Sequence, residues 1–419
     1  MEDKIIYHID VNSAFLSWSA ANRVKLHGDT NDLRDIPAIV GGDQDSRHGI
    51  VLTKSIPAKR YGIQTGEPIV KAKQKCPNLT IIPPEYDLYV DSSKALIKIL
   101  ESIAPKVEQY SIDEAWCDMT GTEKIYGSPV VVAEELREKI YSQLGFTVNI
   151  GISSNKLLAK MASDFKKPNR VHTLFPEEIP GKMWPLPVSE LFYVGRATTR
   201  KLNLLGIKTI GELACTDPSI LHSHLKKHGD IVWSFANGID VGNVENEAPP
   251  NKGYGNSMTV PFDVIDSQTA HLVLLSLCET LGSRLRKDNA KISCVAVSIT
   301  SCEFSHASHQ MQLFSSTNVN EEIHRATCIL FDQLWDKQMP IRQLGVHTSK
   351  VAFKSNRQYN IFDMDKYERL GKLNTAIDEI RARYGEDAIM RASFLDHKLN
   401  HFGGGTSKER RNGITKKVE

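Results

Sequence analysis

Three acidic residues stand where carboxylates are unusual. Asp10 follows the apolar run 5–9, and the adjacent Asp113 and Glu114 lie within the β-rich, largely apolar segment 107–119. Burying a carboxylate is costly unless it is paired or binds a cation, and Mg²⁺ is a hard cation that would compensate. Two such ions about 3.5–4 Å apart can activate an attacking hydroxyl and neutralise a leaving group. These residues therefore indicate metal-dependent group transfer.

The same three residues also have a structural interpretation. An Asp at a strand end is commonly a turn or cap residue, and an Asp-Glu pair is commonly a solvated turn. Neighbouring strand residues point to opposite faces of a sheet, so Asp113 and Glu114 can share one site only where the backbone turns between them. A metal site therefore requires that residues 107–119 form a hairpin with the acidic pair at its apex.

The elements that must position these carboxylates mix strands and helices over residues 1–175. The continuous apolar run that ends at Asp10 predicts a strand buried on both faces. Residues 31–85 are interrupted by many Pro and Gly residues, which predicts a small insertion of short elements and turns. Periodicity predicts helices at 13–23, 86–103, 130–144 and 155–165 and a strand at 146–152.

The second half of the chain has a different organisation. From about residue 180 the pattern predicts short helices without strands, up to a polar stretch at 244–257 whose Pro, Gly and Asn content marks a linker. Beyond it the pattern predicts an α+β domain. Its strands are expected at 258–264, 292–301, 309–315 and 345–353, with helices at 270–287 and 320–335 between them, and the final stretch of the chain is expected to carry one more helix at 369–384.

Composition limits the classes of protein that need to be considered. A chain of 419 residues that is 41% hydrophobic can form three or four domains. It has no signal-peptide pattern and no apolar run long enough to span a bilayer, so we expect a cytoplasmic location and no membrane partner. The formal net charge of +2 is too small to indicate nucleic-acid binding, so any DNA contact has to come from local basic patches.

The segments HIDVNSAF (8–15) and YSIDEAWCDM (110–119), at this separation, resemble the paired palm motifs of Y-family DNA polymerases of the DinB/UmuC type. The resemblance covers almost the whole chain. It implies two Mg²⁺ ions, for which Mn²⁺ can substitute, held by Asp10, the carbonyl of Val11, Asp113 and Glu114. Many DinB-type members carry a second Asp where this chain has Asn12, as UmuC-type members do, and this change leaves the implied metal ligands intact.

The resemblance also implies a multidomain α/β and α+β fold shaped like a right hand, with a palm, small fingers, a helical helix-hairpin-helix thumb and an α+β little finger. The implied domains are a catalytic palm at 1–30 and 86–178, fingers at 31–85, a thumb at 179–245, a linker at 246–257, a little finger at 258–353 and a C-terminal tail at 354–419.

Four residues are implied to bind the nucleotide. Phe15 falls where the family has an aromatic gate under the sugar, although without the family resemblance a Phe on an amphipathic helix is more often a core residue. The segment SIPAKRYGIQTG (55–66) resembles the fingers motif that grips the triphosphate, but Lys59 followed by Arg60 replaces the usual Arg, so either could make the main contact. In GISSNKLLAKMASDFKKPN (151–169), Lys160 matches a lysine that reaches the triphosphate. All three basic residues could instead be solvated surface.

The segment 187–213 is similar to a helix-hairpin-helix module, with Gly195 between two helical stretches. In such modules the glycine lets the backbone approach a phosphate, and free amides at the helix start donate to it. Arg196, Arg200 and Lys201 would add charge to this backbone contact. A helix pair joined by a glycine turn is also a common structural element without any ligand.

In the C-terminal tail, QYNIF (358–362) resembles the peptide that docks replication enzymes on the bacterial sliding clamp. Gln358, Ile361 and Phe362 would be its anchors. An Ile-Phe pair in an otherwise polar tail favours a binding motif, and packing on the little finger is the alternative.

These features support a hypothesis of template-directed DNA synthesis with low fidelity, in which dNTPs are added to a primer 3′ end and lesions are bypassed during DNA damage tolerance. The implied partners are primer–template DNA, dNTPs and the sliding clamp (β subunit). A nucleotidyl cyclase or a nuclease would not need a helix-hairpin-helix, a terminal DNA-binding domain or a clamp peptide. A non-catalytic scaffold would not need all three carboxylates.

Overall fold

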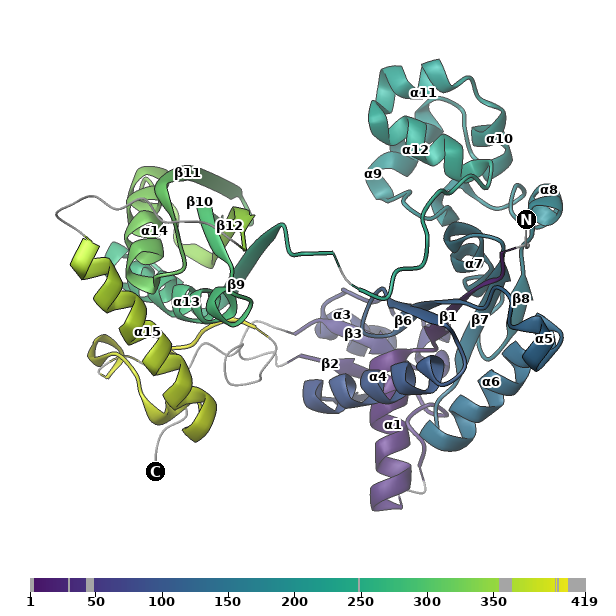
Figure 1. The fold of residues 1–419 in the computed structure, drawn as a ribbon, viewed down its shortest axis with the longest axis horizontal. Helices are drawn as coiled ribbons and strands as arrows, with labels where there is room; N and C mark the ends of the chain where they lie inside the picture. Colours follow the sequence, from purple (N-terminus) through teal and green to yellow (C-terminus); the bar gives the residue numbers. More distant parts are fainter. Residues whose placement is uncertain are drawn as a thin grey trace. The chain divides into compact units, whose positions relative to one another are not determined.

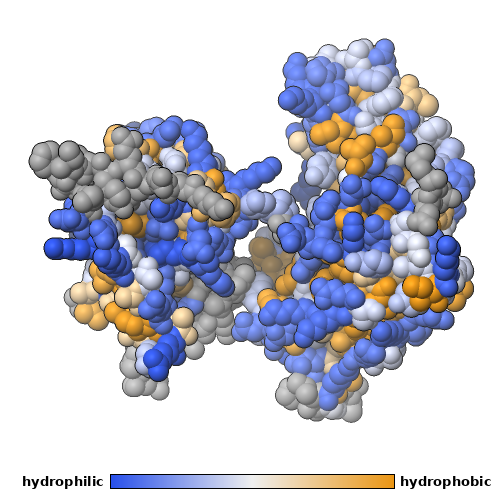
Figure 2. Space-filling view, viewed as in Figure 1, coloured by the Kyte–Doolittle hydropathy of each residue, from blue (hydrophilic) through white to orange (hydrophobic). Residues whose placement is uncertain are grey.

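The computed structural model describes residues 4–28, 31–42, 49–247, 249–353, 364–395, 397 and 399–405. The chain forms two compact units, one built from residues 1–41 and 51–248 and the other from residues 42–50 and 249–419 (Figure 1). Hydrophilic side chains cover most of the visible surface of each unit, with smaller apolar patches between them (Figure 2). In the described part of the chain, no helix has the length and apolar character needed to cross a bilayer.

The first unit is organised around a five-stranded sheet in the order β5-β6-β1-β7-β8. The central strand β1 is antiparallel to both β6 and β7, and every residue in it is buried, as the apolar run predicts. The strands are β1 Ile6–Val11, β5 Lys106–Gln109, β6 Glu114–Asp118, β7 Val148–Ser153 and β8 Val171–Thr173.

The two faces of this sheet differ because side chains alternate along each strand. One face packs in an apolar core against helices α1 (Ala14–His27), α4 (Tyr86–Glu101) and α6 (Pro129–Leu144). The opposite face carries His8 and Asp10 and meets α7 (Lys156–Ser163). Gly151 permits this close packing, since a Cβ there would lie 2.0 Å from the Ala159 carbonyl oxygen. The polar side chains of the sheet therefore gather beneath α7.

A smaller sheet lies between α1 and α4 in the chain, in the order β3-β2-β4, and two short helices pack with it around a separate apolar core. These are the short elements predicted for residues 31–85. Their bounds are β2 Ala38–Gly41, β3 Val51–Lys54, α2 Ile56–Arg60, α3 Ile69–Lys75 and β4 Thr80–Ile82.

Short helices follow β8 and share an apolar core with Leu157, Leu158 and Met161 of α7, so α7 joins the sheet to these helices. They are the strand-free elements predicted beyond residue 180. Their bounds are η1 Pro176–Glu178, α8 Ile179–Lys182, η2 Val188–Glu190, α9 Arg196–Leu204, α10 Ile210–Cys215, α11 Pro218–Leu225 and α12 Lys227–Ala236, and α5 (Glu123–Tyr126) lies earlier in the unit.

The second unit contains a fully antiparallel sheet in the order β11-β10-β12-β9. Two helices, α13 and α14, pack with it around one apolar core, which confirms the predicted α+β character of this region. The elements are β9 Gly253–Val264, α13 Ser267–Lys287, β10 Lys291–Ser301, β11 His306–Thr317, α14 Asn320–Leu334 and β12 Ile341–Ala352.

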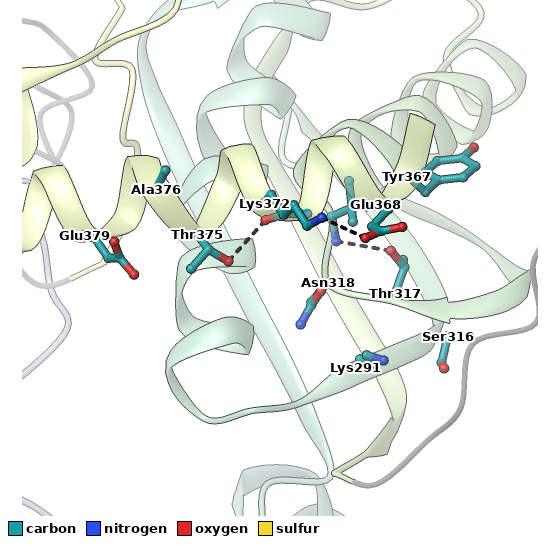
Figure 3. Close-up of a pocket in the computed structure, with 12 residues that line it drawn as sticks. Lys291, Ser316, Thr317, Asn318, Tyr367, Glu368, Lys372, Thr375, Ala376 and Glu379 are labelled. Carbon is teal, nitrogen blue, oxygen red and sulfur yellow. Dashed lines mark hydrogen bonds and ion pairs between the residues drawn. The ribbon is translucent and has the colours of Figure 1, made fainter. Parts of the chain in front are cut away.

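Some described residues beyond 363 pack onto this second unit, and the predicted start of a C-terminal tail at residue 354 stays a prediction. Helix α15 (Met364–Tyr384) is followed by η3 (Glu386–Ala388) and η4 (Ala392–Phe394), and Phe394 and Leu399 belong to the same core as the sheet. A pocket of about 450 Å³ lies between α15 and the strands (Figure 3). Tyr367 and Lys372 line it from the helix, and Lys291 lines it from β10.

Candidate active site

The predicted acidic hairpin is present. Strands β5 and β6 pair antiparallel, residues 110–113 connect them, and Glu114 is the first residue of β6. The turn is held by the N–H groups of Tyr110 and Ser111, which donate to the Glu114 carbonyl oxygen at 3.0 and 3.2 Å. The Ser111 hydroxyl donates to Asp113 Oδ1 at 2.6 Å. The backbone therefore turns at the acidic pair, which is the condition for the two carboxylates to share a site.

Strand register brings this hairpin to Asp10. In the β1–β6 ladder Asp10 lies directly opposite Glu114, so both side chains project from the same face of the sheet. The N–H of Val11 donates to the Asp113 carbonyl oxygen at 3.1 Å, which ties the turn to the end of β1. The structure thus places the Asp10 and Glu114 side chains together and links Asp113 to them through its backbone.

Two lysines neutralise these carboxylates. The Lys160 Nζ lies 3.0 Å from Glu114 Oε1 and 3.8 Å from Asp10 Oδ2. The Lys167 Nζ lies 2.9 Å from Asp10 Oδ1 and 2.9 Å from Asp164 Oδ1. Lys160 was predicted as a triphosphate contact and not as a partner of these acids, and Lys167 was missed, although it lies in the same quoted run, directly before Pro168.

Asn12 holds the loop that carries Lys167. Its side-chain oxygen accepts from the backbone N–H of Asn169 at 2.9 Å, and its amide donates to Asn149 Oδ1 at 3.2 Å. Asn149 in turn donates to the Ser163 carbonyl oxygen at 3.1 Å. An Asp at position 12 would keep the first of these bonds and lose the donor for the second. The Asn at this position therefore has a positioning role that its sequence motif does not reveal.

The two facing carboxyl groups have opposite pKa shifts. Burial raises the pKa of Asp10 to about 6, although Lys167 and Lys160 oppose the shift. Burial also acts to raise the pKa of Glu114, but the His8 ring and the Lys160 ammonium outweigh it and lower the pKa to about 2. Asp10 is therefore the carboxylate whose charge is least well compensated by the protein.

His8 is a further functional candidate that the sequence analysis missed. Its ring is fully buried, with Nδ1 2.7 Å from the Ser163 hydroxyl and Nε2 3.6 Å from Glu114 Oε2. Burial lowers the pKa of His8 to about 4, so the ring is neutral near pH 7. Its Nε2 faces Glu114 from inside the protein and has no hydrogen-bond partner of its own among the described residues. A polar residue inside an otherwise apolar strand was the signal that could have identified it.

The residues at this edge fit a hard divalent cation. Asp10 and Glu114 offer carboxylate oxygens, and Val11 at the strand end beside them offers a backbone carbonyl oxygen. Oxygen atoms of these kinds are the ligands that Mg²⁺ prefers. Among the described residues, however, no three His, Cys, Asp or Glu side chains already converge on one metal position. The Lys160 and Lys167 ammonium groups hold the carboxylates instead, and a bound cation would have to replace part of those contacts.

A pocket of about 300 Å³ lies beside Asp10 and is lined by residues of both sheets in this unit. Three lysines reach it, Lys54 and Lys59 from the small sheet and its helix and Lys167 from the loop after α7. Burial and the neighbouring Lys59 lower the pKa of Lys54. Arg60 is exposed and is not among the lining residues. Three cations around one pocket beside a carboxylate cluster favour a polyanionic ligand.

Phe15 lies on α1, two residues after Ser13, which lines this pocket, but Phe15 itself does not line it. Its half-buried ring stacks on Tyr89 with centroids 4.5 Å apart and also meets Tyr86 edge-on at 6.2 Å. The aromatic packing agrees with the core interpretation, and the partial exposure leaves room for the sugar-gate interpretation.

The glycine turn that the sequence predicts ahead of a helix is present in the first unit, and phosphate binding there stays a prediction. Gly195 is the N-cap of α9, and no side chain caps the first amides of this helix. A pocket of about 660 Å³ at this end is lined by Gly195, Arg196 and Arg200, while Lys201 lies on the same helix outside the lining. The predicted clamp anchors Gln358, Ile361 and Phe362 lie outside the described residues.

Comparison with known proteins gives consistent matches along the chain. The impB/mucB/samB family matches residues 9–164, the C-terminal domain of that family matches residues 251–361, and the IMS family HHH motif matches residues 176–207. DNA polymerase IV of Clostridium acetobutylicum is 44% identical over 94% of this chain and 98% of its own length. DNA polymerase IV of Clostridium kluyveri is 36% identical over 95% of this chain and 100% of its own length.

A solved structure supports the fold. The Y-family DNA polymerase chimera Dbh-Dpo4(243-245)-Dbh aligns with a TM-score of 0.71 at 22% identity, covering 84% of this chain and all of that chain. The likeness confirms the predicted fold class, with mixed α/β sheets followed by a C-terminal antiparallel little-finger sheet.

Proposed function

Since this chain belongs to the impB/mucB/samB family of Y-family DNA polymerases, we propose that it extends a primer 3′ end by two-metal-ion catalysis at Asp10, Asp113 and Glu114. It is a DNA-directed DNA polymerase of the translesion type, a metal-dependent enzyme whose substrates are DNA and dNTPs. The observation that carries the proposed site is the strand register that sets Asp10 opposite Glu114 at the turn containing Asp113.

We assign the metal ligands to Asp10, the Val11 carbonyl, Asp113 and Glu114. Bound there, two Mg²⁺ ions, or Mn²⁺ in their place, would supply Lewis acidity to the primer hydroxyl and positive charge to the leaving pyrophosphate. The raised pKa of Asp10 supports this assignment, because a buried carboxylate that is poorly compensated by the protein gains most from a cation. His8 positions Glu114 and needs no proton exchange of its own.

The lysines bind the incoming triphosphate. Lys54, Lys59 and Lys167 line the pocket beside Asp10, so phosphate oxygens that enter it meet three ammonium groups. Lys160 and Lys167, which now contact carboxylates, would contact phosphate oxygens of the nucleotide in exchange for part of those ion pairs. We favour Lys59 over Arg60 as the main fingers contact because only Lys59 lines the pocket. As a point charge it attracts phosphate without the bidentate geometry of an arginine.

The remaining roles concern the sugar and the DNA. Phe15 would exclude the ribose 2′-hydroxyl, and the helix start at Gly195 and Arg196, with Arg200 and Lys201, would hold backbone phosphates without reading sequence. Low fidelity is expected from a site that tolerates distorted templates. Residues 358–362 are proposed to dock on the sliding clamp through Gln358, Ile361 and Phe362. The alternatives of a cyclase, a nuclease and a scaffold are set aside, because the polymerase relatives match nearly the whole chain.

Primer extension on a defined template with Mg²⁺ and dNTPs tests the proposed site. Asp113→Ala should abolish extension, whereas Asp91→Ala, which removes an exposed carboxylate on α4, should extend like the wild type. Equal extension by the wild type and Asp113→Ala would place the chemistry elsewhere. No extension by any of the three would contradict the proposed polymerisation itself.

A further inference from the structure

Two exposed tyrosines lie between the acidic hairpin and the first turn of α9. Tyr110 is 49% exposed and starts the turn that leads to Asp113, and Tyr193 is 56% exposed and lies two residues before Gly195. Neither hydroxyl has a hydrogen-bond partner among the described residues. Two polar tips on large, accessible rings are therefore available to a ligand that spans this part of the unit.

The two rings belong to one aromatic cluster. Phe192 meets Tyr110 edge-on with centroids 6.2 Å apart and meets Tyr193 edge-on at 4.8 Å. Tyr110 also packs on Trp116 at 4.8 Å, and Tyr193 packs on Phe235 at 5.6 Å. The rings are thus held from behind while their other sides remain accessible. The pKa of Tyr110 is raised by partial burial and then by the nearby Tyr193 and Glu114, which agrees with this grouping.

The backbone of Tyr193 indicates that a side chain is needed at this position. Its φ is +73°, in the left-handed region that glycine adopts freely and that a Cβ disfavours. A glycine would form the same turn without this cost. Strained backbone is retained where the surrounding structure and the function require it, so the tyrosine ring rather than the turn shape accounts for the residue.

We propose that Tyr110 and Tyr193 form a contact surface for the primer strand next to its 3′ end, with their hydroxyls donating to primer phosphates and their rings packing on deoxyribose. The inference rests on the proposed function, in which the primer hydroxyl lies at Asp113 and backbone phosphates are held at Gly195. A strand that connects these two points passes the turn at 110–113 and the residues before α9. The contacts are to the sugar–phosphate chain, so they carry no sequence preference.

The test measures binding of fluorescein-labelled primer–template DNA by anisotropy at one fixed salt concentration, together with single-nucleotide extension. Tyr110→Phe and Tyr193→Phe remove only the hydroxyls, and each should weaken binding roughly three- to ten-fold. Tyr193→Gly should weaken binding at least as much with a small change in Tm, because relief of the left-handed strain offsets part of the lost ring packing on Phe192 and Phe235. Tyr126→Phe, at an exposed tyrosine on α5 outside the cluster, should bind like the wild type.

Primers with a single uncharged methylphosphonate near the 3′ end identify the contact. When the methylphosphonate replaces the phosphate that a tyrosine contacts, the wild type and the corresponding Phe variant should bind that primer with equal affinity. The inference is overturned if the Phe variants bind unmodified DNA with the affinity of the wild type. It is also overturned if the Phe variants bind more weakly than the wild type whichever linkage carries the methylphosphonate. If the wild type extends primers and Asp113→Ala does not, such a result contradicts this inference alone; if the wild type fails to extend, the proposed function fails first.

Discussion

Asp10 in the first unit and Glu279 in the second are both buried carboxylates with two cationic partners, but the partners differ. Asp10 meets the Nζ atoms of Lys167 at 2.9 Å and Lys160 at 3.8 Å, and it lines an open pocket. Glu279 on α13 is only 1% exposed and meets the guanidinium groups of Arg381 at 2.8 Å and Arg391 at 2.7 Å. Asp10 therefore lies at a pocket beside two lysines, whereas Glu279 is enclosed with two arginines.

The difference separates an acid that we propose to be catalytic from one that is structural. Arginine forks satisfy several acceptors in fixed geometry, and Arg381 also donates to the Ile389 carbonyl oxygen, so this network fastens the C-terminal segment to α13. Lysines are point charges on flexible stems and leave carboxylate lone pairs available for another cation. Burial of an acid therefore does not by itself mark an active site. Asp10, the proposed metal ligand, differs from Glu279 in having lysine partners and in lining a pocket.

The largest expected effect is on Asp10. Asp10→Asn removes a proposed metal ligand and should lower the primer-extension rate on the order of 10³-fold or more, since metal stabilisation of the reaction is worth several kcal/mol. The Tm without metal should change little, because Lys167 keeps Asp164 as a partner. Quench-flow single-turnover extension measures the rate. A rate within ten-fold of the wild type would contradict the assignment of Asp10 as a ligand.

The reverse pattern is expected for Glu279. Glu279→Ala removes the carboxylate partner of the buried Arg381 and one of the two carboxylate partners of Arg391, which keeps Glu321, and should lower the free energy of unfolding of the second unit by about 3–5 kcal/mol. Hydrogen exchange of α13 and β9 measures this loss, with Glu303→Ala at an exposed turn as the control. The single-turnover rate on saturating DNA should stay near the wild-type value. A selective loss of that rate would show that the comparison between the two carboxylates is wrong.

A matched pair of cation variants sharpens the comparison. Lys167→Ala should raise the KM for dNTP about 10- to 100-fold, the range expected for a lost contact to a charged group, with a small change in Tm. Arg381→Ala should lower the stability of the second unit with little change in that KM. Lys71→Ala, at an exposed lysine on α3, is the control for loss of general positive charge. Steady-state extension with a dNTP titration gives the KM values.

The smallest expected effect is a difference in pH dependence. Burial acts to raise the pKa of Glu279, but Arg391 and Arg381 hold it below the ordinary 4.5. Its contribution to stability is therefore present above pH 4.5 and is lost as the pH falls through the folded-state pKa. The pKa of Asp10 is raised from 3.8 to about 6, so its effect has the opposite sign and stability declines as the pH rises across that interval.

Thermal unfolding without metal between pH 3 and pH 7 checks both signs. The difference between the wild type and Glu279→Gln should shrink as the pH is lowered below 4.5. The difference between the wild type and Asp10→Asn should shift in favour of the wild type as the pH is lowered from about 6. Identical pH profiles for the wild type and each variant would contradict the pKa shifts on which the comparison depends.

Local patterns in the sequence were enough to predict the elements that carry the acids. The apolar run before Asp10 predicted a buried strand, and the β-rich residues around Asp113 and Glu114 predicted a hairpin, and both are present. These predictions succeed because strand burial and turns depend on residues that are near one another in the chain. The family resemblance then supplied the class of reaction, which local patterns alone left open.

Only the tertiary structure decided which partners these acids have. Lys167 reaches Asp10 across 157 residues of sequence because Asn12 binds the loop at Asn169, and Arg381 reaches Glu279 across 102 residues because α15 packs beside α13. Such contacts depend on how whole elements pack, and this packing cannot be predicted from residue type or spacing. The left-handed backbone of Tyr193 is likewise visible only in the fold. The sequence by itself therefore determined the family, the elements and the acids, and the packing of the elements decided what surrounds each acid.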